Sequence, residues 1–179
     1  MPQTMPPAKL SHFNKQGQAG MVDISQKKAT RRIATAVGTV FISRTTLRLI
    51  EANKLEKGNL WEVARLAGIM AAKKTPELIP MCHPILLGNI DVDFSIQTPN
   101  DGNKNGDKNG EMAEIKITAS VTAAGQTGVE MEAMTAVSIA ALTLYDMCKA
   151  ADKGILLGEI GLTFKSGGKS GTYIRKVKP

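Results

Sequence analysis

The amino-acid sequence predicts an α+β fold, in which helices pack on one face of an antiparallel sheet. Residues 86–97 and 111–122 alternate apolar and polar side chains, as half-buried antiparallel strands do. Residues 59–74 instead repeat apolar side chains at helical spacing. The predicted order of strand, helices, two strands, long helix and strand favours a helix layer on a sheet.

The first half of the chain supplies a strand and two helices. We expect residues 1–10 to be a flexible N-terminal tail and residues 11–179 to form one catalytic domain. Residues 31–43 are rich in β-branched side chains, which indicates a strand, and a short helix follows over residues 45–52. Asn59 can cap the amphipathic helix over residues 59–74, and Thr75-Pro76 ends it.

The second half begins with the two alternating strands, separated by a tract of Gly, Asn, Asp and Lys at about residues 98–110. That tract has nothing to bury, so we interpret it as a flexible hairpin insertion. Residues 128–154 are apolar and rich in small side chains, which predicts a long buried helix. Residues 159–165 form the last predicted strand, with apolar side chains on one side.

Charge and cysteine content narrow the possible partners. Residues 1–57 carry 10 Lys/Arg against 3 acids and residues 58–179 carry 13 against 13, so the first third holds the whole net charge of +7. A basic segment can bind a nucleic acid or an anionic small molecule, or only increase solubility. An aromatic content of 4% argues against an RNA-binding surface that stacks on bases. Cys82 and Cys148 suit a reducing compartment, and without a signal peptide or membrane span we expect a cytoplasmic protein.

Ionisable residues interrupt the long apolar helix. Steps of three and four residues place Glu132, Asp146 and Lys149 on one face. Burial of an ion costs several kcal/mol unless it is paired or used, so this face is a candidate wall of an active site. The alternative is that Asp146 and Lys149 form an exposed ion pair of little consequence.

A second candidate lies in the loop Met81-Cys82-His83-Pro84. His83 is one of two histidines, and prolines hold the loop that carries it. It can contact a ligand or act as a base, although a lone histidine is more often structural. Adjacent Cys82 and His83 could be zinc ligands, but no further cysteine or histidine follows at the spacing of a zinc site. We therefore expect no metal and no cofactor.

The segment Lys165-Ser166-Gly167-Gly168-Lys169-Ser170-Gly171 is a possible phosphate cradle, because glycine backbone N–H groups can turn towards an anion. A flexible solvated tail is the alternative. A Walker A motif is excluded, since its first glycine would fall at Thr163. Lys57 precedes the helix over residues 59–74, where anions are favoured. Together these residues suggest a polyanionic substrate that undergoes proton transfers.

Several long motifs resemble a known family. The segments LSHF, GMVDIS, KKATRRIATAVG, KGNLWEVARLAGIMAAKKTPELIPMCHPILL, TGVEMEAMTAVSIAALTLYDMCKAADKG and KSGGKSG resemble the MoaC family of molybdenum cofactor biosynthesis, in order, over about residues 10–172. The resemblance implies a lyase that converts 3′,8-cyclo-7,8-dihydro-GTP to cyclic pyranopterin monophosphate and releases pyrophosphate. It also implies a ferredoxin-like sheet and a homohexamer, a trimer of dimers with sites at subunit interfaces.

The resemblance further implies which residues act. It marks Asp146, Lys149 and Lys57 as catalytic, and as substrate-binding the set Met81, Cys82, His83, Glu130, Met131, Glu132 and Lys165. Asn14 departs from an expected Asp, which weakens any role for the N-terminal arm. The rival hypothesis is a nucleic-acid-binding module built on the basic first third. The acids within the long helix argue against that hypothesis, so we expect a small-molecule triphosphate as partner, with no nucleic acid and no membrane.

Overall fold

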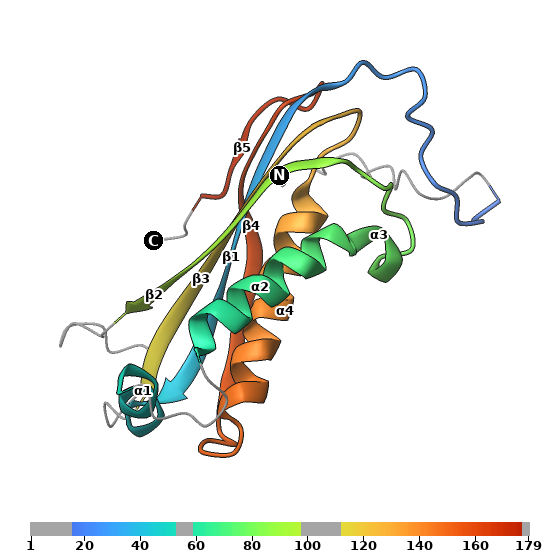
Figure 1. The fold of residues 1–179 in the computed structure, drawn as a ribbon. Coiled ribbons are helices and arrows are strands. Elements are labelled where there is room, and N and C mark those ends of the chain that lie inside the picture. Colours follow the sequence, from blue (N-terminus) through green and yellow to red (C-terminus); the bar gives the residue numbers. More distant parts are fainter. Residues whose placement is uncertain (1–15, 53–58, 98–111, 177–179) are drawn as a thin grey trace, which may run out of the picture.

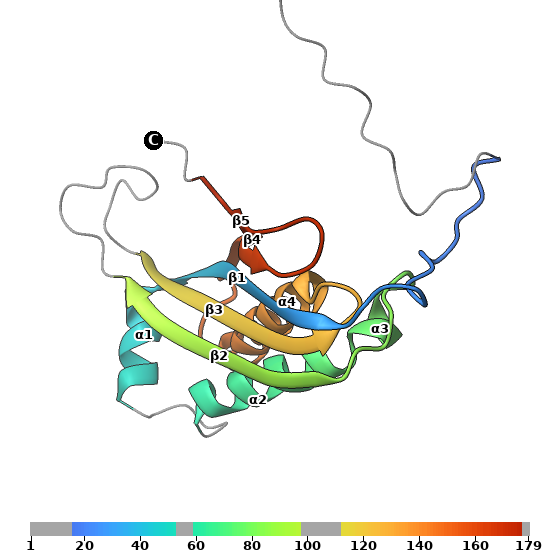
Figure 2. The same cartoon turned by 90° about the horizontal axis from the view of Figure 1, so that it is seen from above.

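The computed structural model describes residues 16–52, 59–97 and 112–176, and in these the chain forms an antiparallel sheet covered on one face by helices (Figures 1 and 2). The strands, in the sheet order β2-β3-β1-β4-β5, are β2 (Leu87–Gln97), β3 (Met112–Gly125), β1 (Thr30–Ser43), β4 (Leu156–Ser166) and β5 (Tyr173–Ile174). The helices are α1 (Arg44–Glu51), α2 (Leu60–Lys73), α3 (Thr75–Leu78) and α4 (Glu130–Cys148). The predicted α+β class is confirmed, and its finer ferredoxin-like assignment stays a prediction.

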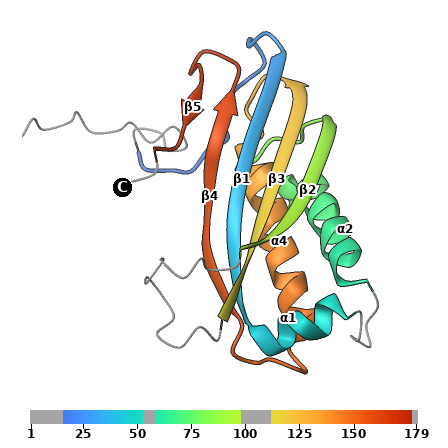
Figure 3. The same ribbon diagram turned by 90° about the vertical axis from the view of Figure 1, so that its left-hand side faces the viewer.

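The central strands β1 and β3 explain why the core forms on the helical side (Figure 3). Along both strands buried residues alternate with partly exposed ones, so each strand has one face towards the helices. The buried face is aliphatic, with Val40, Ile42, Ile115, Ile117 and Val121 at 0–1% exposure. Because a slip of one residue would turn this aliphatic face away from α4, its burial fixes the register of both strands.

Three features differ from the sequence prediction. Helix α2 ends before Thr75-Pro76, as predicted, but an unpredicted short helix, α3, starts there, because proline is tolerated in the first turn of a helix. The helix predicted over residues 128–154 spans only Glu130–Cys148. After it the chain turns, and the Asp152 carboxylate accepts hydrogen bonds from the backbone N–H groups of Ser43 and Gly154 at 2.9 and 2.8 Å. The two-residue strand β5 has no predicted counterpart because it is too short to show a period.

Helices α2 and α4 cross closely at Gly68. A Cβ added at this glycine would lie 2.9 Å from the backbone oxygen of Ala136 on α4 and 3.3 Å from a methyl group of Val92 on β2. No side chain fits there without separation of the two helices, so the absence of a side chain sets their spacing. The α3 turn and the loop Met81–Pro84 follow directly from α2, and their position therefore depends on this crossing.

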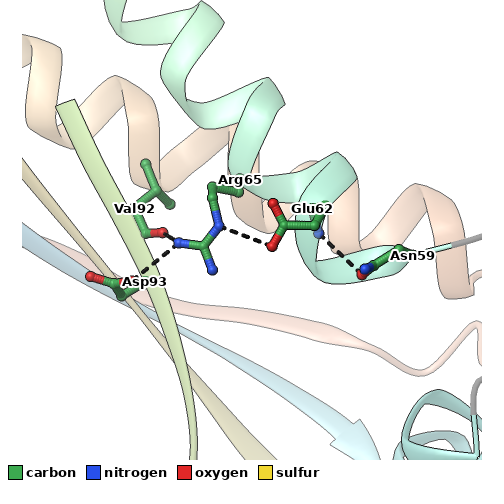
Figure 4. Close-up of polar contacts among 5 residues, drawn as sticks. All are labelled: Asn59, Glu62, Arg65, Val92 and Asp93. Atoms are coloured by element: carbon green, nitrogen blue, oxygen red, sulfur yellow. Dashed lines mark hydrogen bonds and ion pairs between the residues drawn. The ribbon is translucent and has the colours of Figure 1, made fainter.

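A polar network ties α2 to the outer strand β2 (Figure 4). The Arg65 guanidinium donates to the backbone oxygen of Val92 and, at 3.1 Å, to the Asp93 carboxylate. Its Nε lies 3.3 Å from the Glu62 carboxylate, and the Asn59 side chain caps the helix by accepting from the Glu62 backbone N–H at 3.3 Å. The predicted cap at Asn59 is confirmed, and the network holds the helix against the sheet edge.

Some expectations concern residues outside the described ranges. The N-terminal tail over residues 1–10, the insertion over residues 98–110, Asn14 and the predicted catalytic Lys57 all fall there. Within the described residues, none of the helices has the length and apolarity needed to span a bilayer.

Candidate active site

A cavity of about 1080 Å³ opens at the end of the molecule where α4 begins. Four segments form its walls: the chain before β1, the loop after α3, the turn into α4, and the loop after β4. Six of the seven predicted substrate-binding residues lie at the loop after α3 or the start of α4, and the seventh, Lys165, lies at the end of β4. All seven line the cavity, namely Met81, Cys82, His83, Glu130, Met131, Glu132 and Lys165.

Glu132 is the most buried ionisable group of this cavity. Only 2% of the residue is exposed, and burial raises the pKa of its carboxyl group to about 7, with the nearby charge of Glu130 acting in the same direction. Burial, aided by the charge of Glu132, also raises the pKa of the Cys82 thiol, which favours the neutral thiol over a nucleophilic thiolate. A carboxyl group that titrates near neutrality can exchange a proton with a bound heterocycle.

We expect Glu132→Gln to change how stability depends on pH. Because the folded protein holds the Glu132 proton more tightly than the unfolded chain, the carboxyl group stabilises the fold below pH 4.5, and this contribution is lost as pH rises through about 7. The loss reaches about 3 kcal/mol at pH 8. Urea unfolding between pH 4.5 and 8 should therefore show the Gln variant gaining stability relative to the parent protein. Glu77→Gln, at an exposed position, is the control, and parallel curves for parent and Glu132→Gln would contradict the prediction.

An ion pair joins the start of α4 to the end of β4. The Lys165 ammonium lies 2.9 Å from the Glu130 carboxylate, and both side chains are less than one-third exposed. The same ammonium lies 3.3 Å from the Ser170 hydroxyl. Gly167 and Gly168 adopt φ values of 104° and 71°, which side chains rarely tolerate, and a Cβ at Gly167 would lie 2.2 Å from the Arg31 backbone oxygen. The loop is thus folded against the protein rather than a free tail.

Arg32 is a buried cation behind this loop. Its guanidinium donates to the backbone oxygens of Gly125 and Gln126 at 3.2 and 3.3 Å, in the turn that leads into α4. The same group would overlap a side chain at Gly168, so it lies between the two loops. Backbone oxygens orient the guanidinium but carry no net charge, so its positive charge can attract a bound anion.

Asp146 and Lys149 lie elsewhere on the chain, near the far end of α4. Their side chains form an exposed ion pair, with Nζ of Lys149 at 2.6 Å from a carboxylate oxygen of Asp146. This hydrogen bond and the negative charge raise the pKa of Lys149. Asp146 follows Glu132 by 14 residues, about four helical turns or about 21 Å. The two residues project from similar directions around the helix, but within one chain they cannot meet on a small substrate.

The structure adds three cavity residues that the site prediction did not name. Lys27, Lys28 and Arg32 line the same space as Lys165 and Lys169, which belong to the predicted phosphate cradle. The excess of positive charge in the first third was the signal for these three residues, but charge alone cannot distinguish an anion site from a solvated segment. Within the described ranges, no group of three or more His, Cys, Asp and Glu residues is arranged to hold a metal ion.

Comparison with known proteins agrees with the motifs. Residues 21–168 match the model of the MoaC family. The chain belongs to the MoaC family. Relatives named cyclic pyranopterin monophosphate synthase are 49% identical in Thermoanaerobacter sp. strain X514 and 52% identical in Parvibaculum lavamentivorans strain DS-1, each over 168 residues. These alignments cover 94% of this chain and 99% and 98% of the two relatives. A relative of the same name from Geobacillus kaustophilus strain HTA426 is 50% identical.

The family match covers almost all of the segments that line the cavity. The matched segment begins at Met21, one residue before the first cavity-lining residue, Val22, and ends at Gly168, in the loop after β4. Every segment that lines the cavity, apart from the last residues of that loop, therefore belongs to the part of the chain that defines the family.

Proposed function

We propose that the chain is a cyclic pyranopterin monophosphate synthase, a lyase of molybdenum cofactor biosynthesis. Its substrate would be 3′,8-cyclo-7,8-dihydro-GTP, its products cyclic pyranopterin monophosphate and pyrophosphate. The observation that carries the proposal is the cavity itself, which combines a carboxyl group titrating near neutrality, Glu132, with the cations Lys27, Lys28, Arg32, Lys165 and Lys169. The carboxyl group suits a heterocycle that gains and loses protons, and the cations suit a triphosphate.

The placement of the cations favours this enzyme over a nucleic-acid-binding module. Lys27, Lys28 and Arg32 come from the basic first third, and they surround a concave space that also holds Glu130 and Glu132. A duplex needs a continuous basic surface, whereas a small polyanion needs a concave one. The thiol of Cys82 is free, which supports the proposed cytoplasmic location.

We further propose that the complete site forms between two copies of the chain. Asp146 and Lys149, with Lys57, would supply the acid/base chemistry, and the cavity of the second copy would hold the substrate. Two observations support this. The Asp146 end and the Glu132 end of α4 are about 21 Å apart. The exposed sides of α2 and α4 carry apolar side chains, Leu66, Met70 and Leu142, each at least half exposed.

A two-fold contact through the helix layer could bring the separated groups together. In such a contact each copy presents the same surface to the other. Two copies of α4 that run antiparallel would place Asp146 of one copy near Glu132 of the other, since both residues project to similar sides of the helix. Three such dimers would give the proposed hexamer.

The direct test is a turnover assay with the cyclised GTP intermediate. We expect pyrophosphate release in a 1:1 ratio to cyclic pyranopterin monophosphate, measured by a coupled phosphate assay and by fluorescence of the oxidised pterin. GTP, which lacks the 3′,8 bond, is the matched control and should release no pyrophosphate. A folded protein that binds the intermediate and leaves it unchanged would contradict the proposal.

A further inference from the structure

The segment Met21–Ala29, here called the arm, lines one side of the cavity and is weakly anchored. Seven of its nine residues are exposed, and only Val22 and Ile24 are partly covered. Its local hydrogen bonds join near neighbours, Ser25 to Asp23 and Lys27 to Ile24, each at 2.9 Å. A segment with so few buried contacts opens at low free-energy cost.

One hydrogen bond ties the arm to the opposite wall of the cavity. Nε2 of His83 lies 2.8 Å from the backbone oxygen of Val22, across 61 residues of sequence. A backbone oxygen can only accept, so this ring nitrogen carries the proton and donates it. His83 lies in the loop after α3, which the crossing of α2 and α4 holds in place. The bond therefore fastens a weakly held segment to a fixed one.

The arm brings charge to the cavity. Lys27 and Lys28 line it together with Arg32, Lys165 and Lys169, and these five cations outnumber the two acids of the cavity, Glu130 and Glu132. Without a bound anion this excess of positive charge favours an open arm, and a polyanion reverses that balance. A single hydrogen bond, worth about 1 kcal/mol, is enough to shift such an equilibrium about fivefold.

We infer that His83 is a positioning residue of the arm: its Nε2–H group holds Val22, and so keeps Lys27 and Lys28 at the polyanionic part of the substrate. This inference rests on the proposed function for the identity of the polyanion. It gives His83 a role that acts through the arm and needs no contact between that nitrogen and the reacting atoms.

Limited digestion with trypsin tests the inference without turnover, because Lys27 and Lys28 are cleavage sites within the arm. His83→Phe keeps a ring but removes the donor, and His83→Gln keeps an N–H donor. We expect cleavage after Lys27 and Lys28 to be about fivefold faster in His83→Phe than in the parent protein, and close to the parent rate in His83→Gln. Inorganic tripolyphosphate should slow cleavage in the parent and in His83→Gln more than in His83→Phe. His83→Ala is the second donor-free variant, and thermal unfolding shows which variants are folded.

Kinetics supply the second measurement. If His83 acts through the arm, His83→Phe raises KM more than it lowers kcat, and His83→Gln recovers most of the lost kcat/KM. Equal cleavage of the arm in the parent and the folded donor-free variants would overturn the inference, as would equal loss of kcat in His83→Phe and His83→Gln. Digestion with tripolyphosphate needs no synthase activity, so failure of this inference is distinguishable from failure of the proposed function.

Discussion

Asp146→Ala is expected to lower turnover of the cyclised GTP intermediate by about 10²- to 10⁴-fold, the usual contribution of a general acid or base. The same change should leave the fold intact, because the Asp146 side chain is 58% exposed and its partner Lys149 is 52% exposed. Exposed ion pairs contribute little to stability. Pyrophosphate release and thermal unfolding, measured on one preparation, separate the two effects.

A second exposed ion pair provides the control for that prediction. Glu159 on β4 lies 3.3 Å from the Arg175 guanidinium, and neither residue lines the cavity. Glu159→Ala removes the same chemical group from a similar setting and should retain normal turnover. Normal turnover of the cyclised GTP intermediate by folded Asp146→Ala protein would contradict the role assigned to Asp146. Asp146 and Lys149 would then be an exposed ion pair without a function.

Mixed oligomers of two inactive variants should regain activity if the site forms between copies. Asp146→Ala removes the proposed acid/base from one end of α4, and Lys165→Ala removes a cation from the cavity at the other end. In a two-fold dimer of these variants, one of the two sites contains both native residues. A purified mixed dimer should therefore show about half of the parent activity. Co-expression with two affinity tags, followed by sequential purification and assay, measures it.

The control for this experiment pairs two changes at the same end of α4. Asp146 and Lys149 are three residues apart and in contact, so they belong to the same half of the proposed site. Mixed oligomers of Asp146→Ala and Lys149→Ala contain no intact site and should stay inactive. Verified mixed oligomers of Asp146→Ala and Lys165→Ala that also stay inactive would contradict a shared site.

The sequence predicted the framework better than the spatial arrangement of the site. Alternation of polar and apolar residues identified β2 and β3, and helical spacing with the Asn59 cap identified α2, because burial on one face imposes these periods. The α3 turn was missed because Thr75-Pro76 can either end a helix or begin one.

The candidate site shows the same limit more clearly. The motifs identified the seven predicted cavity residues. The periodicity of α4, however, predicted one site wall that contains both Glu132 and Asp146, because a helical period gives the face of a residue and not its position along the helix. Burial separates them: Glu132 is enclosed by the cavity walls, and Asp146 is exposed. Only the packing of distant segments, including the arm with Lys27, decides that difference, and no local pattern encodes it.

The close crossing at Gly68 has a consequence for how inactive variants of this protein are interpreted. Residue 68 touches no part of the cavity and carries no functional group, yet any side chain there must push α2 away from α4. The displacement would pass along α2 to the loop that carries Cys82 and His83. A genetic screen for loss of the synthase would then recover residue 68 among the binding-site residues, and its phenotype would imitate a substrate contact that does not exist.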